Sequence, residues 1–238
     1  MSATLSARTF VLVHGAWHGG WVWRDVARSL RAMGHTVSAP TLSGLGERRH
    51  VSSGTVDLDT HVEDVIAHIE MEDLANVDLV GWSYGGMVIT GVRSRISARI
   101  RSVIYLDAFV PTESKALIDF IDPARREKLD NAKNADMPVP PPPLEAFGPA
   151  TAEILTFVKE RLTNQPWRTF YQPLLGLNQQ PAIPTTYIRC KGFDFAPFAF
   201  FLEEMKKDPA VETHVLDAGH LCMLTASEQT SRLLAVMR

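Results

Sequence analysis

The fold is decided by the stretch Val77-Asp78-Leu79-Val80-Gly81-Trp82-Ser83-Tyr84-Gly85-Gly86. It matches the Gly-x-Ser-x-Gly pattern, in which a buried strand turns sharply into a helix and presents a serine hydroxyl at the turn. Such a turn strains the serine backbone and leaves no room for a Cβ on the flanking glycines. Apolar residues at helical spacing follow at Met87, Val88, Ile89 and Val92. The strand and the helix that the pattern requires are therefore both predicted, and a glycine-rich turn with an idle serine is the weaker alternative.

Composition favours a single domain over residues 1–238. The chain is 45% hydrophobic, which suffices for one large core, and its 24 basic and 27 acidic residues give a net charge of −3. Neither nucleic acid nor a membrane is expected as a partner, because no basic run occurs and no apolar stretch approaches the roughly 20 residues of a spanning helix. Cys190 and Cys222 lack metal-ligand spacing, no secretory signal is recognised, and a cytoplasmic protein without a metal site is expected.

Strands and helices alternate along the chain. Apolar runs predict strands at residues 10–13, 36–39, 77–80, 102–106, 185–190 and 212–216. Helical spacing predicts helices at residues 23–33, 58–74, 198–207 and 227–237, besides the helix after the serine. This alternation predicts an α/β fold with a mostly parallel, doubly wound sheet.

The alternation breaks between residues 111 and 181. Residues 122–133 are polar, the proline-rich residues 137–143 cannot form a strand or a regular helix, and only residues 151–162 recover a helical pattern. The segment also holds several large apolar side chains, namely Phe147, Phe157, Trp167, Phe170 and Tyr171. A solvated tether does not carry so many, so the segment is interpreted as an inserted helical cap, with a disordered spacer as the alternative.

A serine hydroxyl becomes a nucleophile when a base takes its proton and a third group orients that base. His220 is the candidate base, because it follows the last strand in a Gly-His loop and comes after Ser83 in the chain. The acid is open between Asp107, which ends the strand after the serine helix, and Asp194, which follows the strand at 185–190. The remaining histidines considered are interpreted as surface or packing residues: His35, His50, His61, His68 and His214.

Attack on a carbonyl creates an oxyanion that two backbone N–H groups must stabilise. The amide of Tyr84, directly after the serine, is one candidate donor. The other is the amide of Ala16, in the glycine-rich loop at residues 14–21 after the first strand. The substrate pocket is expected to be lined by two residues of this loop and three of the cap: Trp17, His18, Trp167, Phe170 and Tyr171.

With these residues in place, the chain resembles the α/β-hydrolase superfamily. Within it, the chain resembles the plant methyl esterase and hydroxynitrile lyase family together with its small bacterial esterases. The resemblance rests on residues 10–21, 81–86, 105–111 and 219–224. It implies a cofactor-free serine hydrolase with Ala16 and Tyr84 as oxyanion donors.

Two departures from the family pattern bear on function. Relatives with the usual acid carry an aspartate three residues after the position of Cys190, where this chain has Phe193 and places Asp194 one step later. Some superfamily members take the acid from the strand after the serine helix, which favours Asp107 and leaves Asp194 as the alternative. The lyases carry a threonine in the first loop and a lysine after the histidine, where this chain has Gly15 and Leu221.

The resulting hypothesis is a carboxylesterase that cleaves small apolar or aromatic esters or carbamates through an acyl-enzyme on Ser83. The carbamate option comes from similarity to bacterial esterases that degrade benzimidazole carbamate fungicides. The alternatives are a carbon–carbon lyase of the hydroxynitrile type and a ligand-binding, receptor-like hydrolase with little turnover. The expected partner is a small molecule; the sequence does not decide the oligomeric state, for which a homodimer is one option.

Overall fold

The computed structural model describes residues 6–51, 53–177 and 182–237. Its centre is a sheet of six parallel strands in the order β2-β1-β3-β4-β5-β6. The strands are β1 (Thr9–Val13), β2 (Thr36–Ser38), β3 (Val77–Ser83), β4 (Ile100–Ala108), β5 (Thr185–Cys190) and β6 (Val211–Leu216). The predicted α/β-hydrolase fold with a parallel, doubly wound sheet is confirmed.

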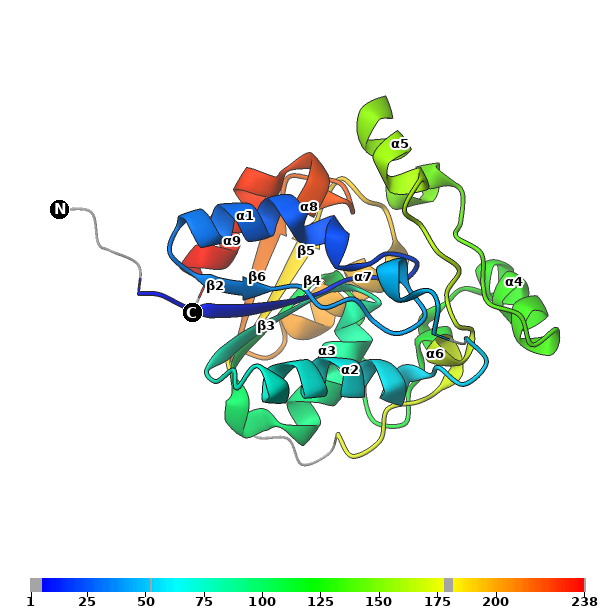
Figure 1. Cartoon of the computed structure of the whole chain (residues 1–238), viewed down its shortest axis with the longest axis horizontal. Helices are drawn as coiled ribbons and strands as arrows, with labels where there is room; N and C mark the ends of the chain where they lie inside the picture. Colours follow the sequence, from blue (N-terminus) through cyan, green and yellow to red (C-terminus); the bar gives the residue numbers. More distant parts are fainter. Residues whose placement is uncertain (1–5, 52, 178–181, 238) are drawn as a thin grey trace.

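Helices cover both faces of this sheet (Figure 1). One face carries α1 (Arg24–Ala32), α8 (Cys222–Thr225) and α9 (Ser227–Val236), and the other carries α2 (Leu58–Met71), α3 (Gly85–Arg95) and α7 (Ala196–Met205). Alternate strand residues point to opposite faces, so Phe10 and Leu12 pack on the α1 side while Val11 and Val13 pack on the α2 side. Burial on both faces explains the wholly apolar strand at residues 10–13.

Short 3₁₀ turns adjust several predicted boundaries. The helix predicted at residues 23–33 begins as a 3₁₀ turn, η1 (Gly20–Trp23), before α1. The helix predicted at 58–74 ends earlier, at Met71, and begins after Asp57, whose side chain accepts the N–H of Thr60 at 2.9 Å. Two further turns are η2 (Gly46–Arg48) and η3 (Ser97–Arg99). Helix ends depend on capping contacts, which periodicity alone does not show.

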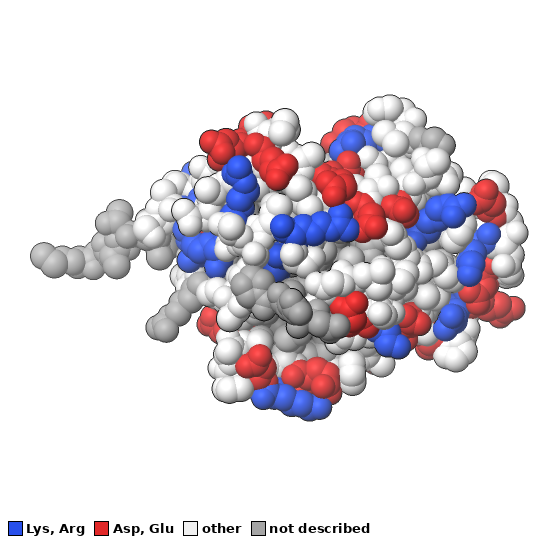
Figure 2. All heavy atoms as spheres, turned by 90° about the horizontal axis from the view of Figure 1, so that it is seen from below, with Lys and Arg blue, Asp and Glu red and all other residues white. Residues whose placement is uncertain are grey.

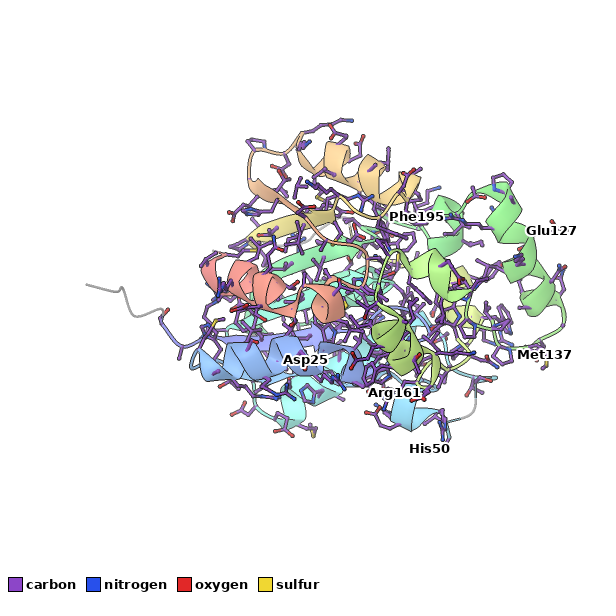
Figure 3. All side chains as sticks on the ribbon, turned by 90° about the horizontal axis from the view of Figure 1, so that it is seen from above. Asp25, His50, Glu127, Met137, Arg161 and Phe195 are labelled. Atoms are coloured by element: carbon purple, nitrogen blue, oxygen red, sulfur yellow. The ribbon has the colours of Figure 1, made fainter. Side chains whose placement is uncertain are left out.

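The segment expected to form a cap lies between β4 and β5, and its residues 178–181 fall outside the described ranges. It contains η4 (Leu117–Phe120), α4 (Pro123–Asn134), η5 (Leu144–Phe147), α5 (Ala152–Lys159) and α6 (Arg168–Tyr171). Figure 1 shows α4 and α5 standing out from the sheet and its helices. Figure 3 shows Glu127 and Met137 at the outer edge of this segment, with Phe195 where it meets α7.

Helix α4 was not predicted as a helix, because none of its residues is buried and its sequence has no apolar face. Its start is nevertheless encoded: Asp122 accepts the N–H of Arg125 at 3.0 Å, and Pro123 occupies the first helical position. In the sequence, an exposed helix of this kind is indicated by its capping residues and not by periodic apolar residues.

The surface carries mixed charge. Figure 2 shows acidic and basic side chains interspersed over the face that it presents. Across the described part of the chain, no helix is both long enough and apolar enough to cross a membrane.

Candidate active site

Ser83 is the last residue of β3, and α3 begins two residues later at Gly85. Its φ of 56° lies in the left-handed region, which a residue with a Cβ rarely adopts. The flanking glycines allow this turn. A Cβ on Gly81 would lie 2.6 Å from the carbonyl oxygen of Gly85, and a Cβ on Gly85 would lie 2.7 Å from that of Val13. The predicted steric role of both glycines is thus visible in the packing.

His220 and Asp107 meet at the carboxyl end of the sheet. Imidazole Nδ1 lies 2.7 Å from carboxylate Oδ2, and the two side chains are 5% and 0% exposed. Because a carboxylate accepts, Nδ1 is the donor, and Nε2 is left as the basic nitrogen of the neutral ring. Asp107 is the penultimate residue of β4 and has a φ of 45°, so its backbone, like that of Ser83, is held in the left-handed region.

Aromatic rings fix the plane of the imidazole. Phe193 stacks on His220 with 4.4 Å between ring centroids and 19° between the planes. The Trp82 ring lies at 4.8 Å, and its Nε1 donates to the backbone carbonyl of His220 at 2.9 Å. Trp82 directly precedes Ser83, so this hydrogen bond ties the histidine loop to the serine turn.

The structure brings Asp107, and not Asp194, to the histidine. Asp194 is exposed in the loop between β5 and α7. It borders a surface hollow of about 540 Å³ together with Phe195 and Phe200. Asp107 is fully buried, and its Oδ1 accepts from Arg189 Nη1 at 2.5 Å and from the N–H of Cys190 at 3.1 Å.

The loop after β1 reaches the serine. A Cβ on Gly15 would lie 2.9 Å from Ser83 Cβ, so the backbone of this loop passes directly beside the turn. In the described ranges, the N–H groups of Ala16 and Tyr84 donate to no protein acceptor. Unpaired backbone donors at a strand-to-helix turn and an adjacent loop are what an oxyanion requires.

Buried neutral histidines hold this loop. His14 Nδ1 donates to the carbonyl of Gly15 at 2.8 Å, and its Nε2 accepts the N–H of Leu42 at 3.0 Å. His18 Nδ1 donates to the carbonyl of Ala16 at 2.7 Å. Burial lowers the pKa of His14 to about 4 and that of His18 to about 3. Both rings are therefore neutral near pH 7. For His14 this agrees with its hydrogen bonds, in which one ring nitrogen donates and the other accepts.

The Tyr84 side chain is anchored on the opposite side of the turn. His61 Nε2 donates to the carbonyl of Ser43 at 2.8 Å, so its Nδ1 accepts from the Tyr84 hydroxyl at 2.8 Å. Burial lowers the pKa of His61 to about 4 and raises that of Tyr84 well above 10. The sequence interpretation of His61 as a packing residue agrees with its burial, but the pattern gave no sign of its contact with Tyr84.

Three of the predicted pocket residues gather beside the turn. Trp17, with a φ of 65°, lies 5.7 Å from the Phe170 ring, which in turn lies 5.9 Å from that of Tyr84. His18 lies 4.9 Å from the Trp82 ring.

Trp167 and Tyr171 instead contact α4 and the turn that follows it. Trp167 Nε1 donates to Asp136 at 2.8 Å, and the Tyr171 hydroxyl donates to Asp130 at 2.5 Å. Their role as pocket residues stays a prediction that these contacts do not favour.

The segment between β4 and β5 is bonded to the same loop. Gln165, fully buried, accepts the N–H of Trp17 at 3.0 Å, and Trp17 Nε1 donates to the carbonyl of Val139 at 3.1 Å. Gln165 and Val139 also exchange backbone hydrogen bonds at 2.7 and 2.9 Å. The proline-rich stretch predicted to lack a strand thus contributes a single bridge residue. No sequence signal marked Gln165.

Comparison with known proteins agrees with this architecture. Residues 10–233 match the Alpha/beta hydrolase family. The chain is 39% identical to the carbendazim hydrolyzing esterase of Nocardioides sp. (strain SG-4G), over 96% of this chain and 98% of that protein. It is 25% identical to polyneuridine aldehyde esterase of Rauvolfia serpentina, over 94% and 93% of the two chains.

A solved structure shows the same fold. An extracellular α/β-hydrolase from a Paenibacillus species superposes with a TM-score of 0.84, at 22% identity, over 95% of this chain and 97% of that one. The match to the family spans nearly the whole sheet and both the serine turn and the histidine loop. The chain belongs to the α/β-hydrolase family, as its sequence motifs predicted.

Proposed function

We propose that this protein is a serine carboxylesterase whose nucleophile is Ser83. The observation that carries the proposal is the 2.7 Å contact between His220 and Asp107, at the edge of the sheet where Ser83 is held in a strained turn. A base with an oriented ring, next to a serine presented by a strand-to-helix turn, is the arrangement that acyl transfer uses.

The steps follow from these positions. Ser83 Oγ attacks the ester carbonyl carbon as His220 Nε2 takes its proton, and the oxyanion is bound by the N–H groups of Ala16 and Tyr84. Collapse breaks the bond to the alcohol oxygen, which receives the proton from His220 and leaves an acyl-serine. Water then attacks the acyl carbon as His220 takes its proton. Ser83 leaves with that proton, and the acid is released. Asp107 keeps Nδ1 protonated and stabilises the imidazolium.

Small apolar or aromatic esters and carbamates are the proposed substrate class. Support comes from the aromatic rings of Trp17 and Phe170 beside the turn and from the 39% identical relative named for carbendazim hydrolysis. With a carbamate, the same steps release an alcohol and a carbamic acid, which loses carbon dioxide. Cytoplasmic location and a small-molecule partner stay predictions.

The test is hydrolysis of short-chain p-nitrophenyl esters by wild type and Ser83→Ala. The proposal predicts a loss of about 10⁴-fold or more in the variant. Ser94→Ala is the matched control, because Ser94 lies on α3 and its hydroxyl donates to the helix carbonyl of Gly91 at 2.7 Å. Turnover by Ser83→Ala equal to that of wild type would overturn the mechanism.

A substrate panel of aryl and alkyl esters, lactones, carbamates and cyanohydrins separates the alternatives. Cyanide release would indicate a lyase; against it, a Cβ at Gly15 would lie 2.9 Å from both Ser83 and Trp82 side chains, so the lyase threonine does not fit there without a shift. Labelling of Ser83 by a serine-directed probe, with tight ligand binding and negligible turnover, would indicate the receptor-like alternative.

A further inference from the structure

Arg189 is a buried cation that the proposed steps do not use. It lies on β5, is 8% exposed, and bonds to three acceptors. Its Nη1 donates to Asp107 Oδ1 and to the carbonyl of Cys190, each at 2.5 Å, and its Nη2 donates to the carbonyl of Phe193. Burying a guanidinium costs free energy unless its N–H groups are hydrogen-bonded or ion-paired. The buried position of Arg189 therefore needs an explanation.

The contact divides the two oxygens of Asp107 between different partners. Oδ1 accepts from Arg189 and from the N–H of Cys190 at 3.1 Å, which leaves Oδ2 to accept from His220 at 2.7 Å. A carboxylate with both oxygens committed cannot rotate. The direction of the bond to the imidazole is therefore set from the side of the carboxylate opposite the histidine.

The same guanidinium also reaches the face of the imidazole. Phe193, whose carbonyl Arg189 holds, stacks on His220 at 4.4 Å. One cation thus fixes both the acid in the plane of the ring and the aromatic group above it.

Arg189 is also the charged side chain that faces the pair formed by Asp107 and His220. Burial raises the pKa of Tyr187 well above 10 and holds His18 neutral with a pKa of about 3, while the hydrogen bond with Cys222, together with burial, raises the pKa of Cys190 above its usual range. The Cys222 thiol is buried beside them. Within the described ranges, no other Arg or Lys pairs with Asp107.

We propose that Arg189 is the positioning residue that makes Asp107 the acid of this site, by clamping Oδ1 and the Phe193 backbone at once. The proposal rests on the proposed function for its effect on catalysis, but its effect on the imidazole can be measured without substrate. Replacing Arg189 by an uncharged residue removes a cation from the Asp107 side of the ring, which favours the protonated imidazole in the variant.

The experiment compares Arg189→Met, Arg189→Lys and the control Arg101→Met. Arg101 pairs with a different buried aspartate, Asp78, at 2.5 Å. The ring titration of His220 is followed by NMR on protein with labelled histidine, the signal being assigned by its absence from His220→Gln. The pH profile of kcat/KM on a p-nitrophenyl ester is measured on the same samples.

Arg189→Met is expected to move the His220 titration and the acid limb of kcat/KM up by about one pH unit, with a loss of about 10²-fold in kcat/KM. Arg189→Lys should keep the titration near that of wild type and lose about 10-fold in kcat/KM, because an ammonium cannot hold Asp107 and the Phe193 carbonyl at once. Arg101→Met should leave both pH curves in place.

An unchanged His220 titration in folded Arg189→Met would overturn the proposal. If that variant does not fold, Arg189→Lys with the kcat/KM of wild type would overturn it as well. A wild type that hydrolyses no ester, but whose His220 titration still responds to Arg189→Met, would refute the proposed function and leave the role of Arg189 at the pair intact.

Discussion

Two fully buried aspartates lie at opposite ends of the central strands, and each is paired with arginine. Asp78, near the start of β3, contacts Arg8 at 2.7 Å, Arg101 at 2.5 Å and the hydroxyl of Ser102 at 2.5 Å. Arg8 also donates to the carbonyls of Leu234, Ala235 and Met237, so this cluster ties the end of α9 to the sheet. Asp107, at the end of β4, contacts Arg189 and His220.

The difference between the two lies in one partner. Every group on Asp78 is a permanent cation or a hydroxyl, whereas Asp107 holds an imidazole that can take up and release a proton. Asp107 also sits at positive φ beside a serine at positive φ, while Asp78 lies inside a regular strand. Burial and ion pairing are therefore common to both carboxylates, and the titratable partner on a strained backbone is what distinguishes Asp107, the proposed acid, from Asp78.

The largest expected effect comes from Asp107→Asn. An amide can turn its NH₂ toward Nδ1 and so favour the wrong tautomer of His220, and kcat/KM should fall by about 10⁴-fold. Ester hydrolysis by purified, folded variant is the measurement. Activity within tenfold of wild type would show that Asp107 does not orient the base.

Asp78→Asn should change stability instead of rate. Loss of the carboxylate leaves Arg8 and Arg101 facing a neutral group, and the free energy of unfolding should fall by about 3–5 kcal/mol. Urea denaturation gives this quantity, and kcat/KM of the folded fraction should stay within about twofold of wild type, within the margin expected for a distant site. A tenfold loss of kcat/KM would mean that the two ends of the sheet are coupled.

The carboxyl end of the sheet should also be the end at which acid lowers the stability of the fold. His14, His18 and His61 have pKa values lowered by burial to about 4, 3 and 4, below an unfolded value of about 6.5. The unfolded chain therefore binds protons first. Stability is complete above pH 6.5 and is lost as the pH falls from 6.5 toward 4, by about 1 kcal/mol per pH unit for each histidine.

His61→Gln tests this on one ring. Urea denaturation between pH 7 and pH 5 should show a slope smaller by about 1 kcal/mol per pH unit than in wild type. Arg101→Met, at the other end of the sheet, should keep the wild-type slope because guanidinium groups stay charged throughout this range. Equal slopes for wild type and His61→Gln would refute the assignment.

Short sequence patterns predicted the features that are determined by residues close together in the chain. The strands, the serine turn and the α/β-hydrolase fold follow from apolar runs and from glycines that sterics require. The contact between His220 and Asp107 joins residues 113 apart in the chain, and the sequence offered two aspartates that could each reach. Arg189 was not singled out, although an arginine inside an otherwise buried strand needs a partner and was a usable signal.

The smallest effect is expected from Asp194→Asn, which completes the comparison among the aspartates. Asp194 is exposed beside the hollow near Phe195, whereas its neighbour Phe193 stacks on the His220 ring. Removing a solvated charge should change kcat/KM by less than about twofold and the free energy of unfolding by no more than about 0.5 kcal/mol. Asp194 can serve as the acid only if Phe193 leaves the imidazole. A loss of more than tenfold in the kcat/KM of Asp194→Asn, together with an active Asp107→Asn, would therefore require the β5–α7 loop to refold around the histidine during catalysis.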